Sequence, residues 1–181
     1  MASNKKSKVD LVEIDAARIN DVCDNYFKWK SLNDSLKSFC SRGINMPDSI
    51  SEPIGCFCLD YFWNKGSGGD AITRDGRKVE FKACSNFDSD LTSFGPTCEF
   101  DNFVFLRFNL NENLCYVYDT GLSSDEVKKL RVNSTQTIED QQKLGRRPHI
   151  RIIDEVINKL GLKPTCVFNI RRCEIVETVE V

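Results

Sequence analysis

The order of helix-like and strand-like segments predicts an α/β protein in which helices pack against a central β-sheet. Three observations support this prediction. Apolar residues recur at helical spacing in residues 9–64, a β-hairpin signal follows, and two strongly β-type segments come next at 100–108 and 114–118. At 181 residues the chain is long enough to bury a full core, so we expect one domain over 1–181.

Three helices are expected before the hairpin. The first spans 9–30, and the second spans 32–42, where the following glycine can cap it. The third spans 51–64. The first two carry no chemistry that the sequence identifies, so we expect residues 1–48 to be a scaffold or a dimer interface.

The hairpin places three charged side chains together. Residues 74–77 contain the Asp-Gly pair typical of a tight turn. Alternation along the second strand puts Glu80 and Lys82 on one face. The hairpin then brings Asp70, which precedes the first strand, opposite these two residues.

These three side chains have the chemistry for cleaving a phosphodiester. Asp70 and Glu80 repel each other unless a cation lies between them, and carboxylate oxygens suit Mg²⁺. Lys82 can orient a water or help to deprotonate it, and can offset charge that grows on a phosphate. The glycine-rich turn at 66–69 would let the backbone approach a ligand. The alternative is a solvated hairpin with three surface charges.

Glu52 has two interpretations. Ser49 and Glu52 have capping-box spacing, which would make Glu52 part of a helix N-terminus. Alternatively, since its helix leads into the glycine-rich turn, Glu52 lies near Asp70 as an outer metal or water ligand. The candidate catalytic residues are therefore Asp70, Glu80, Lys82 and Glu52.

The rest of the chain alternates in the same way. Residues 83–96 are polar and too irregular for a helix, so we expect a loop. The further expected helices are 124–130, 137–144 and 150–160, and the further strands are 165–170 and 174–179.

Charge is distributed unevenly. The net charge is −2, yet residues 128–172 hold eleven Lys or Arg against four Asp or Glu. A basic second half is typical of a protein with a phosphate-tracking face, and Arg, Gln, Asn, Ser and Thr can read base edges. The alternatives are a basic loop packed on acidic neighbours and, at 93–96, a turn around a buried aromatic. The candidate DNA contacts are Ser85, Asn86, Asp90, Thr92, Ser93, Gln141, Gln142, Lys143, Arg146, Arg147, His149 and Arg151.

Cysteine and histidine usage argues against a zinc site and against a Ser-His or Cys-His catalytic site. The nine cysteines are odd in number and lie mostly in apolar patterns, so we expect reduced thiols that pack as small hydrophobes. The cysteines and the single histidine, His149, lack zinc-ligand spacing, and one histidine disfavours a Ser-His or Cys-His site. The first residues lack the apolar run of a signal peptide, so we expect a cytoplasmic protein without a membrane contact.

The chain resembles the PD-(D/E)xK nuclease superfamily and, more narrowly, the small Bsp-type type II restriction endonucleases. The resemblance covers roughly 52–162, and Asp70 and Glu80 match the metal-binding carboxylates while Lys82 matches the catalytic lysine. Gly69 departs from the proline in the superfamily name, at a position that varies widely. The residues that carry the narrower resemblance are Glu80-Phe81-Lys82-Ala83, Asp90-Leu91-Thr92-Ser93-Phe94-Gly95-Pro96, Phe100-Asp101, Gln141-Gln142 and Gly145-Arg146-Arg147-Pro148.

The resemblance implies a restriction-endonuclease-like core around a mixed sheet, with the catalytic and DNA-recognition elements in 49–181. It also implies a homodimer that uses Mg²⁺ to cut both strands of a short palindrome such as GCNGC, with Arg146 and Arg147 as guanine readers. A separate methyltransferase would be a functional partner without direct contact. Two other functions stay open: a repair or junction-resolving nuclease, and a DNA-binding regulator whose carboxylates are structural.

Overall fold

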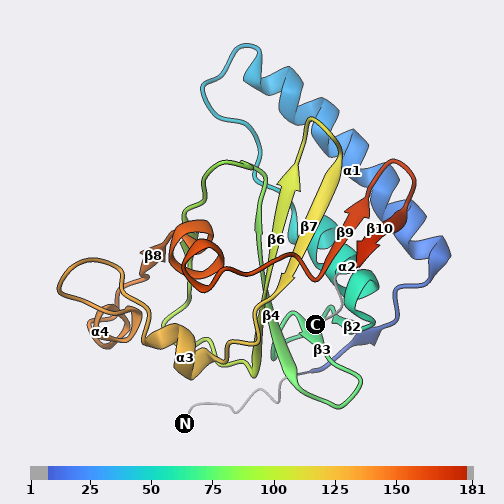
Figure 1. Ribbon diagram of the computed structural model, residues 1–181. Coiled ribbons are helices and arrows are strands. Elements are labelled where there is room, and N and C mark those ends of the chain that lie inside the picture. Colours follow the sequence, from blue (N-terminus) through green and yellow to red (C-terminus); the bar gives the residue numbers. More distant parts are fainter. Residues whose placement is uncertain (1–7, 179–181) are drawn as a thin grey trace, which may run out of the picture.

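The computed structural model describes residues 8–178 and shows an eight-stranded mixed β-sheet with helices on both faces (Figure 1). The strand order is β1-β2-β3-β4-β6-β7-β9-β10, and within this sheet only β4 and β6 pair in parallel. The α/β class and the mixed central sheet are thus confirmed.

The strands of the large sheet are β1 Leu11–Val12, β2 Phe62–Asn64, β3 Ala71–Ile72, β4 Lys78–Cys84, β6 Asn102–Asn109, β7 Leu114–Asp119, β9 Cys166–Asn169 and β10 Glu174–Thr178. A separate two-stranded sheet pairs β5, Thr92–Ser93, with β8, His149–Ile150.

The helices are α1 Ala16–Lys37, α2 Asp48–Leu59, α3 Ser124–Lys128, α4 Ile138–Lys143 and the π-helical segment η1 Ile153–Asn158. In the part of the chain that the structure describes, no helix is long and apolar enough to cross a bilayer.

Alternating side chains of β6 enter two hydrophobic clusters on opposite faces of the sheet. Val104 and Leu106 pack with residues of α1 and α2. Phe103 and Phe105 pack with residues of α3, α4 and η1. Four cysteines are buried in the first cluster, as expected of small hydrophobes: Cys23, Cys56, Cys115 and Cys166.

The N-terminal helices differ from the prediction. Residues 11–12 form β1, which pairs with β2, and one helix, α1, replaces the two that we expected. The helix begins after Asp15 because the Asp15 carboxylate accepts a hydrogen bond from the Arg18 N–H at 2.8 Å, which caps the first turn.

Three other boundaries also differ. The predicted helix 51–64 ends at Leu59, because Asp60 adopts a left-handed conformation (φ 56°) that redirects the chain into β2. The expected loop 83–96 contains β5, and Ile150 belongs to β8 instead of the last helix. The predicted helices at 124–130 and 137–144 and the late strands are confirmed.

Gly55 lets α2 lie close to β4. A Cβ atom at this position would be 2.5 Å from Cε1 of Phe81. We therefore expect Gly55→Ala to lower the free energy of unfolding by about 1–3 kcal/mol, as overpacking does, and to reduce activity by moving α2 away from β4. Urea unfolding measures the effect. Gly95→Ala is the matched control, since its Cβ would meet nothing closer than 3.9 Å, and equal stability of the two variants would contradict the prediction.

Candidate active site

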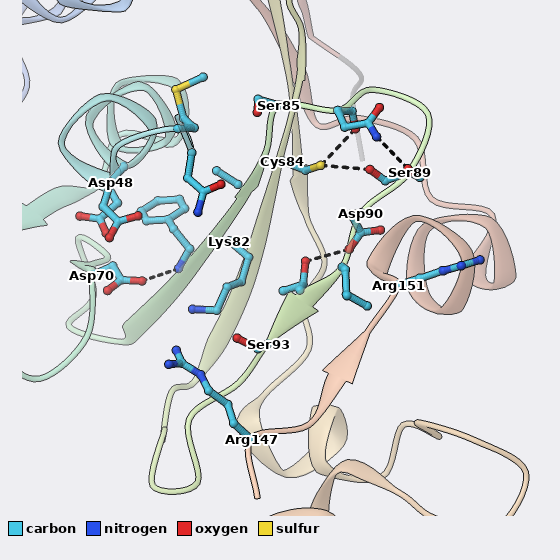
Figure 2. Close-up of a pocket in the computed structure, with 18 residues that line it drawn as sticks. Asp48, Asp70, Lys82, Cys84, Ser85, Ser89, Asp90, Ser93, Arg147 and Arg151 are labelled. Atoms are coloured by element: carbon cyan, nitrogen blue, oxygen red, sulfur yellow. Dashed lines mark hydrogen bonds between the residues drawn. The ribbon is translucent and has the colours of Figure 1, made fainter. Parts of the chain in front are cut away.

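A cleft of about 770 Å³ opens beside β4. One wall comes from α2 and the segment before it, and the other from residues 85–93 and the chain around β8. Figure 2 shows Asp70 and Lys82 in this cleft, with Ser93 and Arg147 across from them.

The hairpin fixes Asp70 against β4. Strands β3 and β4 are antiparallel, with Ala71 opposite Val79. The backbone N–H of Asp70 donates to the Val79 carbonyl at 3.0 Å, and the Asp70 carboxylate accepts from the Phe81 N–H at 2.8 Å. The Asp70 side chain therefore lies along β4, near Glu80 and Lys82.

Asn64 holds the turn that leads into Asp70. Its side-chain amide donates to the Gly69 carbonyl at 2.9 Å, and its side-chain oxygen accepts from the N–H groups of Asp10 (3.0 Å) and Gly66 (3.1 Å). The Asn64 backbone N–H donates to the Asp70 carbonyl at 3.0 Å. We did not single out Asn64 from the sequence, although an asparagine directly before a glycine-rich turn is a recognisable signal.

The first glycine of this turn, Gly66, serves packing. A Cβ at Gly66 would lie 1.9 Å from the Lys8 carbonyl oxygen, so glycine is needed for contact with the N-terminal segment.

Glu80 and Lys82 lie on one face of β4 and form an ion pair. Their side chains are only 12% and 23% exposed, and the Lys82 ammonium is 5.7 Å from the centre of the Phe94 ring. Burial alone would lower the pKa of Lys82, but the carboxylates of Glu80 and Asp70 outweigh it and raise this pKa above its ordinary value. Lys82 is thus a fully charged ammonium. Lys82 lines the cleft. Glu80 is not among the lining residues and contacts the cleft only through its ion pair with Lys82.

Glu52 projects from α2 into the same cleft and does not cap the helix. Pro47 occupies the N-cap position, without a side-chain cap hydrogen bond, because the helix begins at Asp48. The Glu52 carboxyl instead accepts from the indole N–H of Trp63 at 2.7 Å. Burial and the nearby Asp70 charge raise the pKa of Glu52 to about 8.

Two carboxylates of the site have the chemistry to hold a divalent cation. Burial and the charge of Glu80 raise the pKa of Asp70 to about 6, so the positive charge of Lys82 does not fully offset the repulsion between Asp70 and Glu80. Within residues 8–178, no three His, Cys, Asp or Glu side chains come together as a full protein cage for a metal. Mg²⁺ does not need one, because it keeps several waters and takes one or two carboxylates together with phosphate oxygens. Asp70 and Glu80 fit that donor set.

Glu52 should make stability depend on pH in the absence of divalent metal. Its pKa in the folded state, about 8, lies above its ordinary value of 4.5. As pH rises from about 4.5 to about 8, the unfolded state ionises first, so the free energy of unfolding falls; above both pKa values the loss is complete. We expect Glu52→Gln, which can still accept from Trp63, to flatten this decline. Thermal unfolding at pH 5 and pH 8 measures it, and parallel profiles for both proteins would contradict the prediction.

The pairing of β5 with β8 gathers candidate DNA contacts from distant parts of the chain. Thr92 pairs with Ile150, and Ser93 pairs with His149. The candidates that line the cleft are Ser85, Asn86, Asp90, Thr92, Ser93, Arg147 and Arg151.

The other five candidates are not among the residues that line the cleft. Gln142 donates to the Gly95 carbonyl at 2.8 Å, which ties α4 to the turn after β5. Lys143 is 2.9 Å from Glu139 in an exposed ion pair. The remaining three are Gln141, Arg146 and His149.

Asp90 has a structural role within the fold, and its contact with DNA stays a prediction. It is 7% exposed, and its carboxylate accepts from the N–H groups of Ile152 (2.8 Å) and Ile153 (2.9 Å) and from the Thr92 hydroxyl (2.7 Å). These contacts use both oxygens to cap the last helix.

The two cleft arginines differ in direction. The Arg147 side chain extends toward Lys82 and Ser93, whereas that of Arg151 extends away from the catalytic residues (Figure 2). Arg151 is 3.8 Å from Asp154, and Arg147 has no ion-pair partner among residues 8–178.

The N-terminal part of the chain also reaches the cleft, which the sequence did not indicate. Asn45 and Asp48 line the wall opposite Ser93. Their segment is tied to α1, because the Trp29 indole N–H donates to the Asn45 carbonyl at 3.1 Å and the Ile44 N–H donates to the Asn33 side chain at 2.9 Å.

The β3–β4 hairpin thus brings together Asp70, Glu80 and Lys82 beside a cleft that Arg147 also lines. Two carboxylates and a lysine are the groups that a metal-assisted endonuclease needs. Comparison with known proteins identifies the class. The family model described as Bsp6I restriction endonuclease matches residues 14–159. The type II restriction enzyme Bsp6I of Bacillus sp. (strain RFL6) is 41% identical over 169 residues, which cover 93% of this chain and 97% of that enzyme. The chain belongs to the Bsp6I restriction endonuclease family and is a type II restriction endonuclease, an enzyme that acts on DNA.

Proposed function

We propose that the protein hydrolyses phosphodiester bonds in both strands of a short palindromic site in double-stranded DNA, with Mg²⁺ as cofactor. The observation that carries this proposal is the hairpin geometry. The Asp70 carboxylate accepts a hydrogen bond from the backbone of β4. Glu80 and Lys82 lie two residues apart on one face of that strand and form an ion pair.

Each side chain has a distinct role in the proposed reaction. Asp70 and Glu80 would hold Mg²⁺, which supplies Lewis acidity to the scissile phosphate. Lys82, kept charged by its carboxylate neighbours, donates a hydrogen bond that orients the attacking water and offsets negative charge on the phosphate. Glu52 is an outer residue of the site, held by the hydrogen bond from the Trp63 indole.

The cleft supports recognition of a palindrome by a homodimer. One site of this size cuts one strand, and a symmetric target presents two equivalent strands, so we propose a two-fold dimer. Arg147 lines the cleft, and arginine binds guanine through two hydrogen bonds, so we propose a G·C-rich target such as GCNGC. We place the enzyme in the cytoplasm, with a methyltransferase that protects the same site.

Digestion of plasmid DNA tests this function. Purified protein with Mg²⁺ should yield discrete fragments, EDTA should abolish them, and sequencing the fragment ends should identify the target and the position of the cut. A smear, or cleavage of branched DNA irrespective of sequence, would overturn site-specific restriction. Intact plasmid with folded protein would overturn nuclease activity.

Arg147 should contribute more to DNA binding than its neighbour Arg146. Arg147 lines the cleft and Arg146 does not. We expect Arg147→Ala to weaken binding to the target by about 1–3 kcal/mol if the side chain reads a guanine, and Arg146→Ala to have a smaller effect. Gel shifts with target and scrambled duplexes measure both. Equal weakening on every sequence would assign Arg147 to a phosphate, and a larger effect of Arg146→Ala would contradict the prediction.

A further inference from the structure

Leu91 is an exposed apolar side chain within a polar cleft. It is 71% exposed and lies at the cleft, between Asp90 and Thr92. Other exposed leucines, such as Leu160 at 54%, are outside the cleft. Single exposed leucines are common on protein surfaces, so the exposure of Leu91 alone does not indicate a function. The contacts of the residues on either side of Leu91 add a second observation.

The backbone on both sides of Leu91 is fixed. Asp90 is held by the N–H groups of Ile152 and Ile153 and by the Thr92 hydroxyl. Thr92 is itself 7% exposed and pairs with Ile150 across the β5–β8 sheet. Leu91 therefore lies between two buried, hydrogen-bonded neighbours, and its own side chain is left exposed at the cleft.

The residues that line the cleft with Leu91 carry charges of both signs. The cations are Lys82, Arg147 and Arg151, and the acidic residues are Asp48, Glu52, Asp70 and Asp90. In the proposed function DNA enters this cleft, where Arg147, which extends toward Lys82 (Figure 2), contacts the DNA near the catalytic residues. A duplex held by these groups brings its bases and sugars, the parts that an apolar side chain can contact, against Leu91.

We propose that Leu91 is a wedge that inserts against a base step of the target and partly unstacks it. This inference rests on the proposed function and adds the way in which the cleft deforms its DNA. An apolar wedge at this position makes recognition depend on how easily the contacted base step unstacks, in addition to direct base contacts.

The test uses duplexes that carry the target, mapped from digested plasmid, with 2-aminopurine at successive positions. Binding is measured with Ca²⁺ in place of Mg²⁺. We expect wild-type protein to raise the fluorescence at one step within or beside the site, since unstacking relieves quenching. Leu91→Ala should lose this rise and bind the target about tenfold or more weakly, as expected for one buried leucine side chain. Leu91→Met, which keeps an apolar side chain of similar size, should retain most of both.

Leu160→Ala is the matched control and should behave as wild type. Wild-type protein that cuts plasmid but leaves 2-aminopurine fluorescence unchanged at every position would overturn the wedge and leave the nuclease intact. So would a Leu91→Ala protein with an unaltered fluorescence rise, or one whose only change is in its oligomeric state. Wild-type protein that cuts no DNA would instead overturn the proposed function.

Discussion

Lys82→Ala is expected to slow DNA cleavage by about 10²–10⁴-fold while binding to the target stays nearly unchanged. Lys82 carries a full positive charge beside Glu80 and Asp70, and it faces the cleft. Its removal takes away the group that orients water and offsets phosphate charge in the transition state. Single-turnover cleavage with saturating protein separates this loss from binding, which gel shifts measure.

The matched control for Lys82 is Lys78→Ala. Lys78 lies on the same strand, is exposed, and does not line the catalytic cleft, so its replacement should leave the cleavage rate as in wild type. Lys82→Met, which keeps much of the side-chain volume, should lose cleavage as Lys82→Ala does. If Lys82→Ala protein cuts normally, the lysine has no part in the chemistry and the carboxylates would be structural.

Asp70→Asn is expected to reduce cleavage about 10³-fold or more, because loss of a metal ligand removes several kcal/mol of charge stabilisation from the transition state. Asparagine keeps the shape of the side chain and can still accept from the Phe81 N–H. The loss should therefore reflect the missing charge and not a disrupted hairpin. Plasmid digestion over a range of Mg²⁺ concentrations measures it.

The same variant gives a readout that does not depend on activity. The pKa of Asp70 in the folded state is about 6, above its ordinary value of 3.8. Its ionisation therefore lowers stability as pH rises from about 4 to about 6, and the loss is complete above that window. At pH 7.5 without metal, Asp70→Asn should be as stable as wild type or up to about 3 kcal/mol more stable. Mg²⁺ should raise the Tm of wild type but not of the variant, and equal shifts in both would exclude Asp70 as a ligand.

The hairpin that carries the candidate catalytic residues could be predicted, because the residues that form it are close together in the sequence. Asp70, Glu80 and Lys82 lie within a short stretch, and an Asp-Gly turn with strand alternation places them on one strand pair. Strands β6 and β7 were predicted for the same reason, since each is a continuous apolar run. The roles of these side chains in catalysis stay a prediction.

The remaining parts of the site depend on contacts that sequence spacing does not encode. The structural contacts of Asp90 could not be predicted, because its partners, Ile152 and Ile153, are more than sixty residues away. Asn45 reaches the cleft only because Trp29 and Asn33 tie its segment to α1. Glu52 had the spacing of a cap with Ser49, but the N-cap is Pro47, two residues earlier.

The contacts of Asn64 couple Asp70, the proposed metal ligand, to the segment around β1. The side-chain oxygen that holds the Gly66 N–H also holds that of Asp10, beside the edge strand β1, and the Asn64 backbone reaches the Asp70 carbonyl. The position of Asp70 is thus tied to the segment around Asp10. If Asp70 acts as proposed, substitutions in this segment should alter the cleavage rate.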